Sequence, residues 1–416
     1  MTESGPNNSL PIHRTPPPLR LQRRSGLLPM SDDFGLRLPR QSVWISISAS
    51  MGSYFSRPVL EWRARRELGI VGMSRISVLI MFLLGASVSS AQEDVRERPL
   101  FADDSPLVLT IEGPFRQLSR DGSERPERAG LVRYRDAEGQ EVILDVEIRI
   151  RGKSRLELCS FPPLRLNFRR SQMNGTVFAG QNHLKLVTLC KKGGSYRDYL
   201  AQEYQIYRAF NALTDRSFRV RWVSVEYIET GTRRRTSSTE PAFLIEEDWE
   251  VAERNDMEAL EVESLEISDL DPRHTALLGV FQFMIGNTDW SSIRAVEGED
   301  CCHNGKVIGA PDMGAIVIPY DFDQSGVINI PYAQPNPALR IQSVRQRLYR
   351  GLCAMNDELE WVIQRLNEQR AEIEGVFNSD RVSEGRRNSA LIYLRESYEI
   401  INDPEQRNEE IVEACR

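Results

Sequence analysis

Apolar and polar residues alternate along the chain from about residue 107. The stretches Leu107–Glu112, Leu131–Arg135 and Glu141–Arg151 have a period of two, which is typical of strands with one buried face. The same alternation returns at Leu164–Phe168 and His183–Leu189. This pattern predicts a mostly antiparallel sheet in the N-terminal half of the chain.

The spacing then changes to that of helices. Apolar residues recur at helical intervals over Tyr196–Leu213, and strand character resumes at Val220–Ile228 and Ala242–Glu246. Further helices are expected at 275–285, 338–375 and 386–401, with short strands around Gly305–Ile308 and Ala315–Ile318.

This order of elements predicts a fold of the α+β class. A β-rich half that precedes an α-rich half suits a two-lobed molecule with a cleft between its lobes. We expect a β-rich N-lobe at 92–247 and an α-rich C-lobe at 248–416.

A secretory signal peptide is predicted at residues 73–91. A positive residue, Arg75, precedes a short apolar stretch, and Ser89 and Ala91 supply the small residues of a cleavage site. The apolar stretch is too short to span a bilayer. The preceding residues 1–72 are expected to be disordered or mistranslated. The mature chain is therefore expected to be exported, periplasmic or secreted, without a stable transmembrane span.

Composition and cysteine content narrow the class of protein. The 416 residues carry a formal net charge of −7, which disfavours nucleic acid as a partner because phosphate binding needs a basic surface. The six Cys suggest disulfides in an exported chain, with the pairing left open. The vicinal Cys301 and Cys302 are expected to bond to different partners rather than to each other.

The densest group of polar residues with chemical potential lies between Gly286 and Gly326. Asp289 follows an apolar helix, Asn304 lies in a Cys-rich insert, and Asp321 and Asp323 follow a strand. Phosphoryl transfer uses such a set, because oxygen ligands hold Mg²⁺ against the phosphates and a separate carboxylate accepts the proton of the attacking hydroxyl. Each motif alone also occurs in ordinary turns and helix caps.

A lysine and a glutamate precede this group. Lys185 is one of only five Lys in the chain and lies in the middle of a predicted strand, while Glu203 lies on the apolar side of the next helix. Protein kinases use a strand Lys paired with a helix Glu to hold the nucleotide phosphates. The alternative is a Lys that reaches solvent from a sheet edge and a solvated Glu. The apolar strand that ends at Glu246 could hold an adenine edge through its backbone.

In this order the motifs resemble those of the spore-coat protein H (CotH) family of secreted atypical kinases. The resemblance covers residues 107–353. Its first elements are an Arg-Gly-x-Ser sequence (Arg151–Ser154), an extended segment (Pro163–Phe168), and a strand and a helix (Leu184–Leu189 and Tyr196–Leu213). They are followed by a strand that ends in Glu (Phe243–Glu246), an Asn-x-Asp sequence with a later Asn (Asn287–Asp289 and Asn304), and a Pro-x-Asp-x-Asp sequence (Pro319–Asp323).

The resemblance implies a two-lobed atypical protein-kinase-like fold that uses ATP with Mg²⁺ or Mn²⁺. Asp289 would orient or deprotonate the acceptor hydroxyl, and Lys185, paired with Glu203, would contact the phosphates. The remaining roles that it implies are Asn304 and Asp321 as metal ligands assisted by Asp323, and Arg151, Ser154 and Glu246 as nucleotide-binding residues.

Two departures from ordinary protein kinases accompany the resemblance. Asn304 follows Asp289 by 15 residues rather than about five, so the insert Ser291–Cys302 must loop out, held by a disulfide of Cys301 or Cys302. Asp323 stands where the metal-binding triplet usually has Gly.

These observations predict an exported kinase that phosphorylates Ser and Thr of extracytoplasmic proteins and depends on ATP and a divalent metal. The alternative is a catalytically inactive kinase-like structural or binding module of the cell envelope. A metal-dependent hydrolase using Asp289, Asp321 and Asp323 is less favoured, because only His303 lies in the group and such sites usually use several His.

Overall fold

The structure is a computed structural model that describes residues 98–232, 236–296 and 298–416. These residues belong to one compact unit, Ser87–Arg416. The predicted upstream segment and the predicted signal peptide lie outside the described residues.

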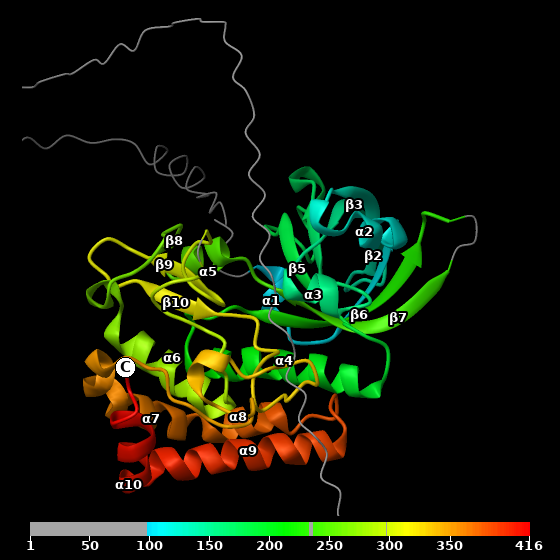
Figure 1. The fold of residues 1–416 in the computed structure, drawn as a ribbon. Coiled ribbons are helices and arrows are strands. Elements are labelled where there is room, and N and C mark those ends of the chain that lie inside the picture. The colour runs from blue at the N-terminus through cyan, green and yellow to red at the C-terminus, as the bar shows by residue number, and fades with distance from the viewer. Residues whose placement is uncertain (1–97, 233–235, 297) are drawn as a thin grey trace, which may run out of the picture. The chain divides into compact units, whose positions relative to one another are not determined.

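Seven strands form a closed barrel (Figure 1). The order around the barrel is β1-β2-β3-β4-β5-β7-β6. Neighbouring strands are antiparallel except β1 and β6, which run parallel and close the barrel. The strands are β1 (Leu107–Gly113), β2 (Arg128–Arg135), β3 (Glu141–Ile150), β4 (Leu164–Phe168), β5 (His183–Thr188), β6 (Val220–Glu229) and β7 (Ser237–Ile245).

Alternation along the strands divides the barrel into an inner and an outer face. On β5, Leu184 and Leu186 belong to the cluster that fills the interior, whereas Val187 belongs to a second cluster outside the barrel. Lys185 lies on the outer face with Val187, as the period of two requires. The strands predicted in this half are present as β1 to β7, but β7 begins at Ser237 rather than at the predicted Ala242.

The two-lobed atypical protein-kinase-like fold predicted from the sequence is wrong. The first seven strands do not form the mostly antiparallel sheet of a separate N-lobe, because β1 pairs in parallel with β6 over seven residues and closes a mixed barrel. The helices pack against this barrel. Alternating strands predict the faces correctly, but periodicity does not show which strands become neighbours.

A second, three-stranded sheet lies next to α5 (Asp248–Arg254). Its order is β10-β9-β8, and all of its pairs are antiparallel. The strands are β8 (Glu258–Leu260), β9 (Gly305–Gly309) and β10 (Ile316–Pro319).

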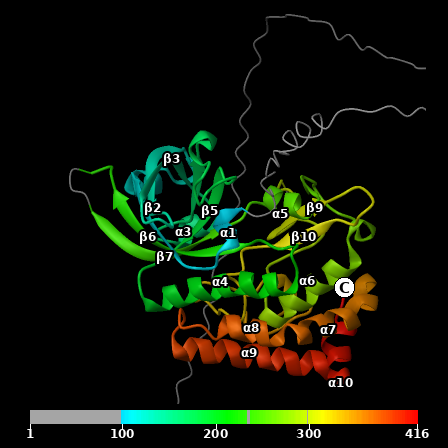
Figure 2. The ribbon, with the colours of Figure 1, turned by 180° about the vertical axis from the view of Figure 1, so that it is seen from behind.

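Helices form layers on one side of the barrel. In both views α4 lies between the barrel and the layer of α8 and α9 (Figures 1 and 2). The predicted helix over 338–375 begins only at Leu359, after a 3₁₀ turn at Cys353–Glu358. The other helices are α1 (Pro99–Ala102), α2 (Phe115–Asp121), α3 (Ser154–Leu158), α4 (Gly194–Leu213), α6 (Pro272–Ile285), α7 (Leu359–Glu368), α8 (Arg370–Phe377), α9 (Glu384–Asn402) and α10 (Pro404–Arg407).

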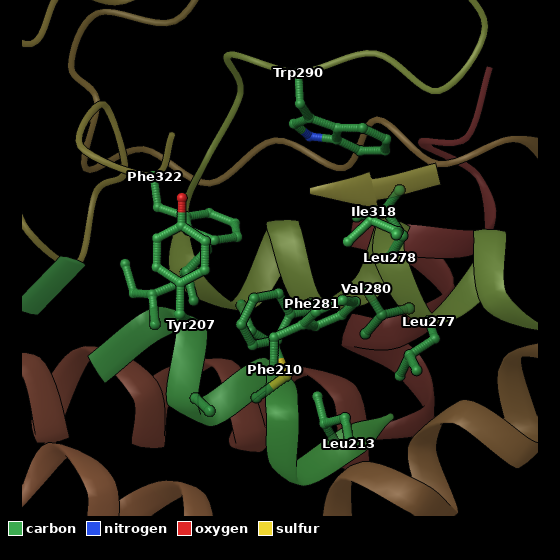
Figure 3. Close-up of a cluster of buried hydrophobic side chains, with 14 of the residues drawn as sticks. Tyr207, Phe210, Leu213, Leu277, Leu278, Val280, Phe281, Trp290, Ile318 and Phe322 are labelled. Atoms are coloured by element: carbon green, nitrogen blue, oxygen red, sulfur yellow. The ribbon is translucent and has the colours of Figure 1, made fainter. Parts of the chain in front are cut away.

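An aromatic core fixes the segment after β10 against α4 and α6. The ring of Tyr207 lies 4.8 Å from that of Phe322, and the ring of Phe210 lies 4.8 Å from that of Phe281. Figure 3 shows these side chains facing one another across the two helices. Because Phe322 is fully buried, the backbone that carries its neighbours Asp321 and Asp323 is held in one place.

Three disulfides join the six cysteines: Cys159–Cys190, Cys301–Cys302 and Cys353–Cys415. The expectation that Cys301 and Cys302 bond to different partners is wrong, so their bond does not tie the insert to another segment. The disulfides are compatible with an exported protein. In the described part of the chain, no helix has the length and apolar character needed to cross a membrane.

Candidate functional site

A small hollow, of about 350 Å³ when the space open to solvent is included, lies where the outer face of the barrel meets α4 and the end of β10. The turn at 151–154 and the start of α3 form one wall, and Tyr320 with Asp321 forms another. Outer-face residues of β5 and β7, Val187 and Ile245, contribute the apolar part. Glu203 and Tyr207, which are four residues apart and therefore share one face of α4, complete it.

A buried guanidinium occupies the centre of the acidic residues. Arg155 Nη2 lies 2.7 Å from Oε1 of Glu203 and 2.6 Å from Oδ1 of Asp321. Its Nε lies 3.2 Å from Oδ2 of Asp323. Arg155 is only 7% exposed. Residues more than 160 positions apart in sequence are thus brought into one ionic cluster, which we call the Arg155 cluster.

Three carboxylates around one cation do not all ionise without cost. Burial and the neighbouring carboxylates raise the pKa of Asp323 to about 7, although Arg155 opposes this shift. Burial also raises the pKa of Glu203. Burial disfavours the charge of Arg155, but the carboxylates outweigh it and raise its pKa well above the ordinary value. Arg155 therefore stays charged, and burial favours the protonated forms of both Glu203 and Asp323.

Two tyrosines hold the acidic residues in place. The hydroxyl of Tyr207 accepts a hydrogen bond of 3.0 Å from the backbone N–H of Asp321. The hydroxyl of Tyr332 donates to Oδ2 of Asp323 at 2.6 Å. Burial raises the pKa of both hydroxyls, so both remain protonated.

Asp289, His303 and Asn304 form a second polar group. Asp289 Oδ1 lies 2.7 Å from His303 Nε2, and the amide of Asn304 donates to Asp289 Oδ2 at 3.0 Å and to its carbonyl at 2.7 Å. The insert therefore does loop out and returns Asn304 to Asp289. The side chain of Asp289 is 38% exposed, which leaves it open to a reactant.

The open end of the β9–β10 hairpin, where Asn304 precedes β9 and Tyr320 follows β10, joins the two groups. The backbone N–H of Tyr320 donates to the carbonyl of Asn304 at 3.0 Å, and Tyr320 directly precedes Asp321. Asn304 and Asp321 both have a positive φ, of 51° and 60°. Such backbone conformations are uncommon outside Gly and are concentrated at functional sites. A continuous series of contacts thus runs from Asp289 to Arg155.

Lys185 does not pair with Glu203 as predicted. Its Nζ lies 3.0 Å from Oε2 of Glu247, whose Oε1 lies 3.3 Å from Arg165. Lys185 is in register with Ile245 at the end of β7, so the residue two positions later comes within its reach. Burial lowers the pKa of Lys185, and Glu247 offsets this only in part. Lys185 is not among the residues that line the hollow.

The structure distributes the predicted nucleotide-binding residues between two places. Arg151 and Ser154 line the hollow, and no carboxylate lies within ion-pair distance of Arg151 in the part of the chain that the structure describes. The carboxylate of Glu246 instead accepts from Arg254 at 3.0 Å, and its backbone N–H donates to Arg219. The predicted adenine edge at Glu246 is thus already hydrogen-bonded within the protein.

The contacts that Asn304, Asp321 and Asp323 already make show which of these predicted ligands could bind a divalent metal. Among residues 98–232, 236–296 and 298–416, no three His, Cys, Asp or Glu converge as a metal site. Mg²⁺, however, needs only one or two protein carboxylates when phosphates supply the rest. Asp321 fits, because Arg155 contacts only its Oδ1. Asn304 directs its amide nitrogen at Asp289, which leaves its amide oxygen as the candidate ligand. Asp323 is buried and already contacts Arg155 and Tyr332.

The Asp289–His303 contact gives an expected NMR result. The hydrogen bond that the His303 imidazole donates to Asp289 raises the pKa of His303 above its ordinary value of 6.5. In Asp289→Asn we therefore expect the pKa of His303 to fall back towards 6.5. Since the folded-state pKa is the raised one, the stabilisation from this pair is complete below pH 6.5 and is lost as the pH rises through the folded-state value. Histidine resonances followed over pH measure it, because the chain has only four His. An unchanged His303 pKa in the variant would contradict the contact.

Three residues of the site were not singled out by the sequence analysis: Arg155, Glu247 and Tyr332. Arg155 lies one position beyond the Arg-Gly-x-Ser sequence, but Arg is so frequent in this chain that the type carries little signal. Glu247 directly follows Glu246, and spacing alone does not distinguish the two. Tyr332 lies in a loop without periodicity.

Comparisons with known proteins do not assign the chain to a family. No protein-family model matches it, and no curated protein sequence matches it. The resemblance to the CotH family therefore stays a prediction that rests on the short motifs alone.

Proposed function

We propose that the chain is an exported phosphotransferase that moves the terminal phosphoryl group of ATP to Ser or Thr hydroxyls of proteins outside the cytoplasm. The single observation that carries this proposal is the series of contacts that runs from Asp289 through Asn304 and Tyr320 to Asp321 and Arg155. Of these residues, Tyr320, Asp321 and Arg155 line the hollow. This series links a partly exposed carboxylate, an amide and a second carboxylate, and phosphoryl transfer uses such groups in combination.

Each group has a defined part in the reaction. The acceptor oxygen forms a bond to the γ-phosphorus, the bond from that phosphorus to the bridging oxygen breaks, and ADP leaves. Asp289 takes the proton of the attacking hydroxyl, and Asn304 orients its carboxylate. The guanidinium of Arg151, at the wall of the hollow, contacts phosphate oxygens. Mg²⁺ or Mn²⁺, held by Asp321 and Asn304, would neutralise phosphate charge.

Transfer of label from γ-labelled ATP tests this function. The purified full chain is incubated with Mg²⁺ or Mn²⁺ and with dephosphorylated casein as a general acceptor. We expect label in protein only when a divalent cation is present, and none above background for Asp321→Asn. Asp380→Asn is the matched control, since Asp380 is an exposed carboxylate that pairs with Arg387 far along the chain.

The same experiment distinguishes the phosphotransferase from a second candidate function, which the Arg155–Asp321 contact favours. Because Arg155 already neutralises Asp321, the same hollow could bind an anionic ligand without catalysis, as an inactive binding module of the envelope. Stabilisation of the chain by ATP in a thermal-shift assay, without label transfer under any metal, would support the binding module. Equal transfer by wild type and Asp321→Asn would contradict the metal role.

A further inference from the structure

One end of the barrel carries a second hollow, of about 1150 Å³ up to its open mouth. Three aromatic rings form its wall: Phe115 of α2, Phe161 before β4 and Tyr227 of β6. Their centroids lie 4.9–5.6 Å apart in edge-to-face contacts. This hollow is separate from the Arg155 cluster, and open ends of barrels are common sites for small ligands.

The hydroxyl of Tyr227 is a buried polar group without a partner. Tyr227 is only 6% exposed, and within the described residues its hydroxyl makes no hydrogen bond. A buried donor left unpaired is unfavourable and is rare in folded proteins. Burial raises the pKa of Tyr227, so the group remains a donor and calls for an acceptor oxygen. The half-buried ring of Phe161 contacts the ring of Tyr227 edge to face, with centroids 4.9 Å apart.

Charges at the mouth of this hollow favour an anion. Arg116 and Lys192 are exposed there, and neither has a carboxylate within ion-pair distance in the described ranges. The two glutamates that also line it are engaged. Glu229 accepts from the backbone N–H groups of Arg116 and Gly231, and Glu240 pairs with Arg197 outside the wall, at 2.8 Å.

We propose that this end of the barrel binds a small aromatic carboxylate. Its ring packs against Phe115 and Phe161, its carboxylate lies between Arg116 and Lys192, and an oxygen accepts from the hydroxyl of Tyr227. An aromatic amine fits less well, because its charge would face the two free cations. The proposal does not depend on the phosphotransferase function.

Titration calorimetry of the full chain with three probes tests the proposal. The probes are 3-phenylpropionate, 3-phenylpropan-1-ol and phenethylamine, which share a phenyl ring and differ in charge. We expect the acid to bind most tightly and the amine not to bind. Tyr227→Phe should weaken binding of the acid about fivefold, because it removes one hydrogen bond. The double substitution Arg116→Gln with Lys192→Gln should weaken it about tenfold, since each exposed charge contributes modestly.

Lys191→Gln is the matched control. Lys191 adjoins Lys192 in sequence, but its Nζ lies over the ring of Tyr196 and it does not line the hollow. Binding to this variant should equal binding to the wild type.

Four results would overturn the proposal. They are an absence of binding by all three probes at millimolar concentration, equal binding of amine and acid, equal weakening by Lys191→Gln and by the double substitution, and tighter binding of the peptide Gly-Gly-Phe than of 3-phenylpropionate. The last result would assign the hollow to the C-terminus of a peptide rather than to a free acid.

Discussion

Replacing Arg155 by Met is expected to lower the free energy of unfolding by about 3–5 kcal/mol at pH 7.5, because removing one partner of a buried ion pair leaves charge uncompensated. Arg155 is the only cation within ion-pair distance of Glu203, Asp321 and Asp323 in the described part of the chain. Met fills much of the volume of the Arg side chain, so the loss would report charge rather than a cavity. Urea denaturation followed by tryptophan fluorescence measures it.

The pH dependence of this effect has a definite sign. Folding raises the pKa of a carboxyl such as that of Asp323. At a pH between its unfolded-state and folded-state pKa values, the carboxyl is protonated in the folded chain and ionised in the unfolded chain. The free energy of unfolding therefore falls as the pH rises between these two values. For Asp323 the window lies between 3.8 and about 7. Without Arg155 the shift should be larger still. The difference between wild type and Arg155→Met should therefore shrink when the pH is lowered from 7.5 to 5.

Two controls separate charge from packing in this experiment. Arg155→Lys keeps a cation in the cluster and should be less destabilising than Arg155→Met. Arg387→Met removes the partner of Asp380, which is fully exposed, and should change stability far less than Arg155→Met. Equal stabilities of wild type and Arg155→Met at pH 7.5 would show that the cluster contributes nothing to the fold.

The same cluster shows how far the sequence could predict the molecule. Alternation predicted the strands well, and β4 begins and ends at the expected residues, Leu164 and Phe168. The closure of the barrel could not be predicted, because it depends on β1 meeting β6, more than 100 residues later in the chain. Local patterns predict which face of a strand is buried, whereas the choice among distant partners depends on the packing of the whole fold.

Sequence spacing also could not predict which charged residues pair with each other. Alternation along β5 sets Lys185 on the face opposite to Leu184 and Leu186, which is the outer face of the barrel. It gave no basis for choosing Glu247 over Glu203, since a long side chain reaches several positions. The grouping of Asp289 with Asn304 was expected from the motif order, despite the insert between them, and the hydrogen bonds of Asn304 now connect the two.

The substitution Asp289→Asn is expected to have the largest effect on phosphoryl transfer. It keeps the shape of the side chain but removes the group that accepts the hydroxyl proton. General-base catalysis of this kind contributes about 10²- to 10⁴-fold, so kcat/KM for the acceptor should fall by that factor. ATP should bind with unchanged affinity, because Asp289 contacts His303 and Asn304 rather than the residues that line the hollow. Label transfer under single-turnover conditions, together with ATP affinity, gives the two quantities.

Asp300→Asn is the matched control for this variant, because Asp300 is an exposed carboxylate of the same insert and should leave the rate unchanged.

His303→Gln tests whether the histidine positions the base. It keeps a donor that can reach Asp289 and should lower the rate less than Asp289→Asn, while altering the pH profile, since the pKa of His303 is raised by that contact. Retention of more than a tenth of the wild-type rate by Asp289→Asn would exclude this carboxylate as the base. Loss of ATP binding together with the rate would instead assign it to ligand binding, because a base that acts only on the acceptor leaves nucleotide affinity unchanged.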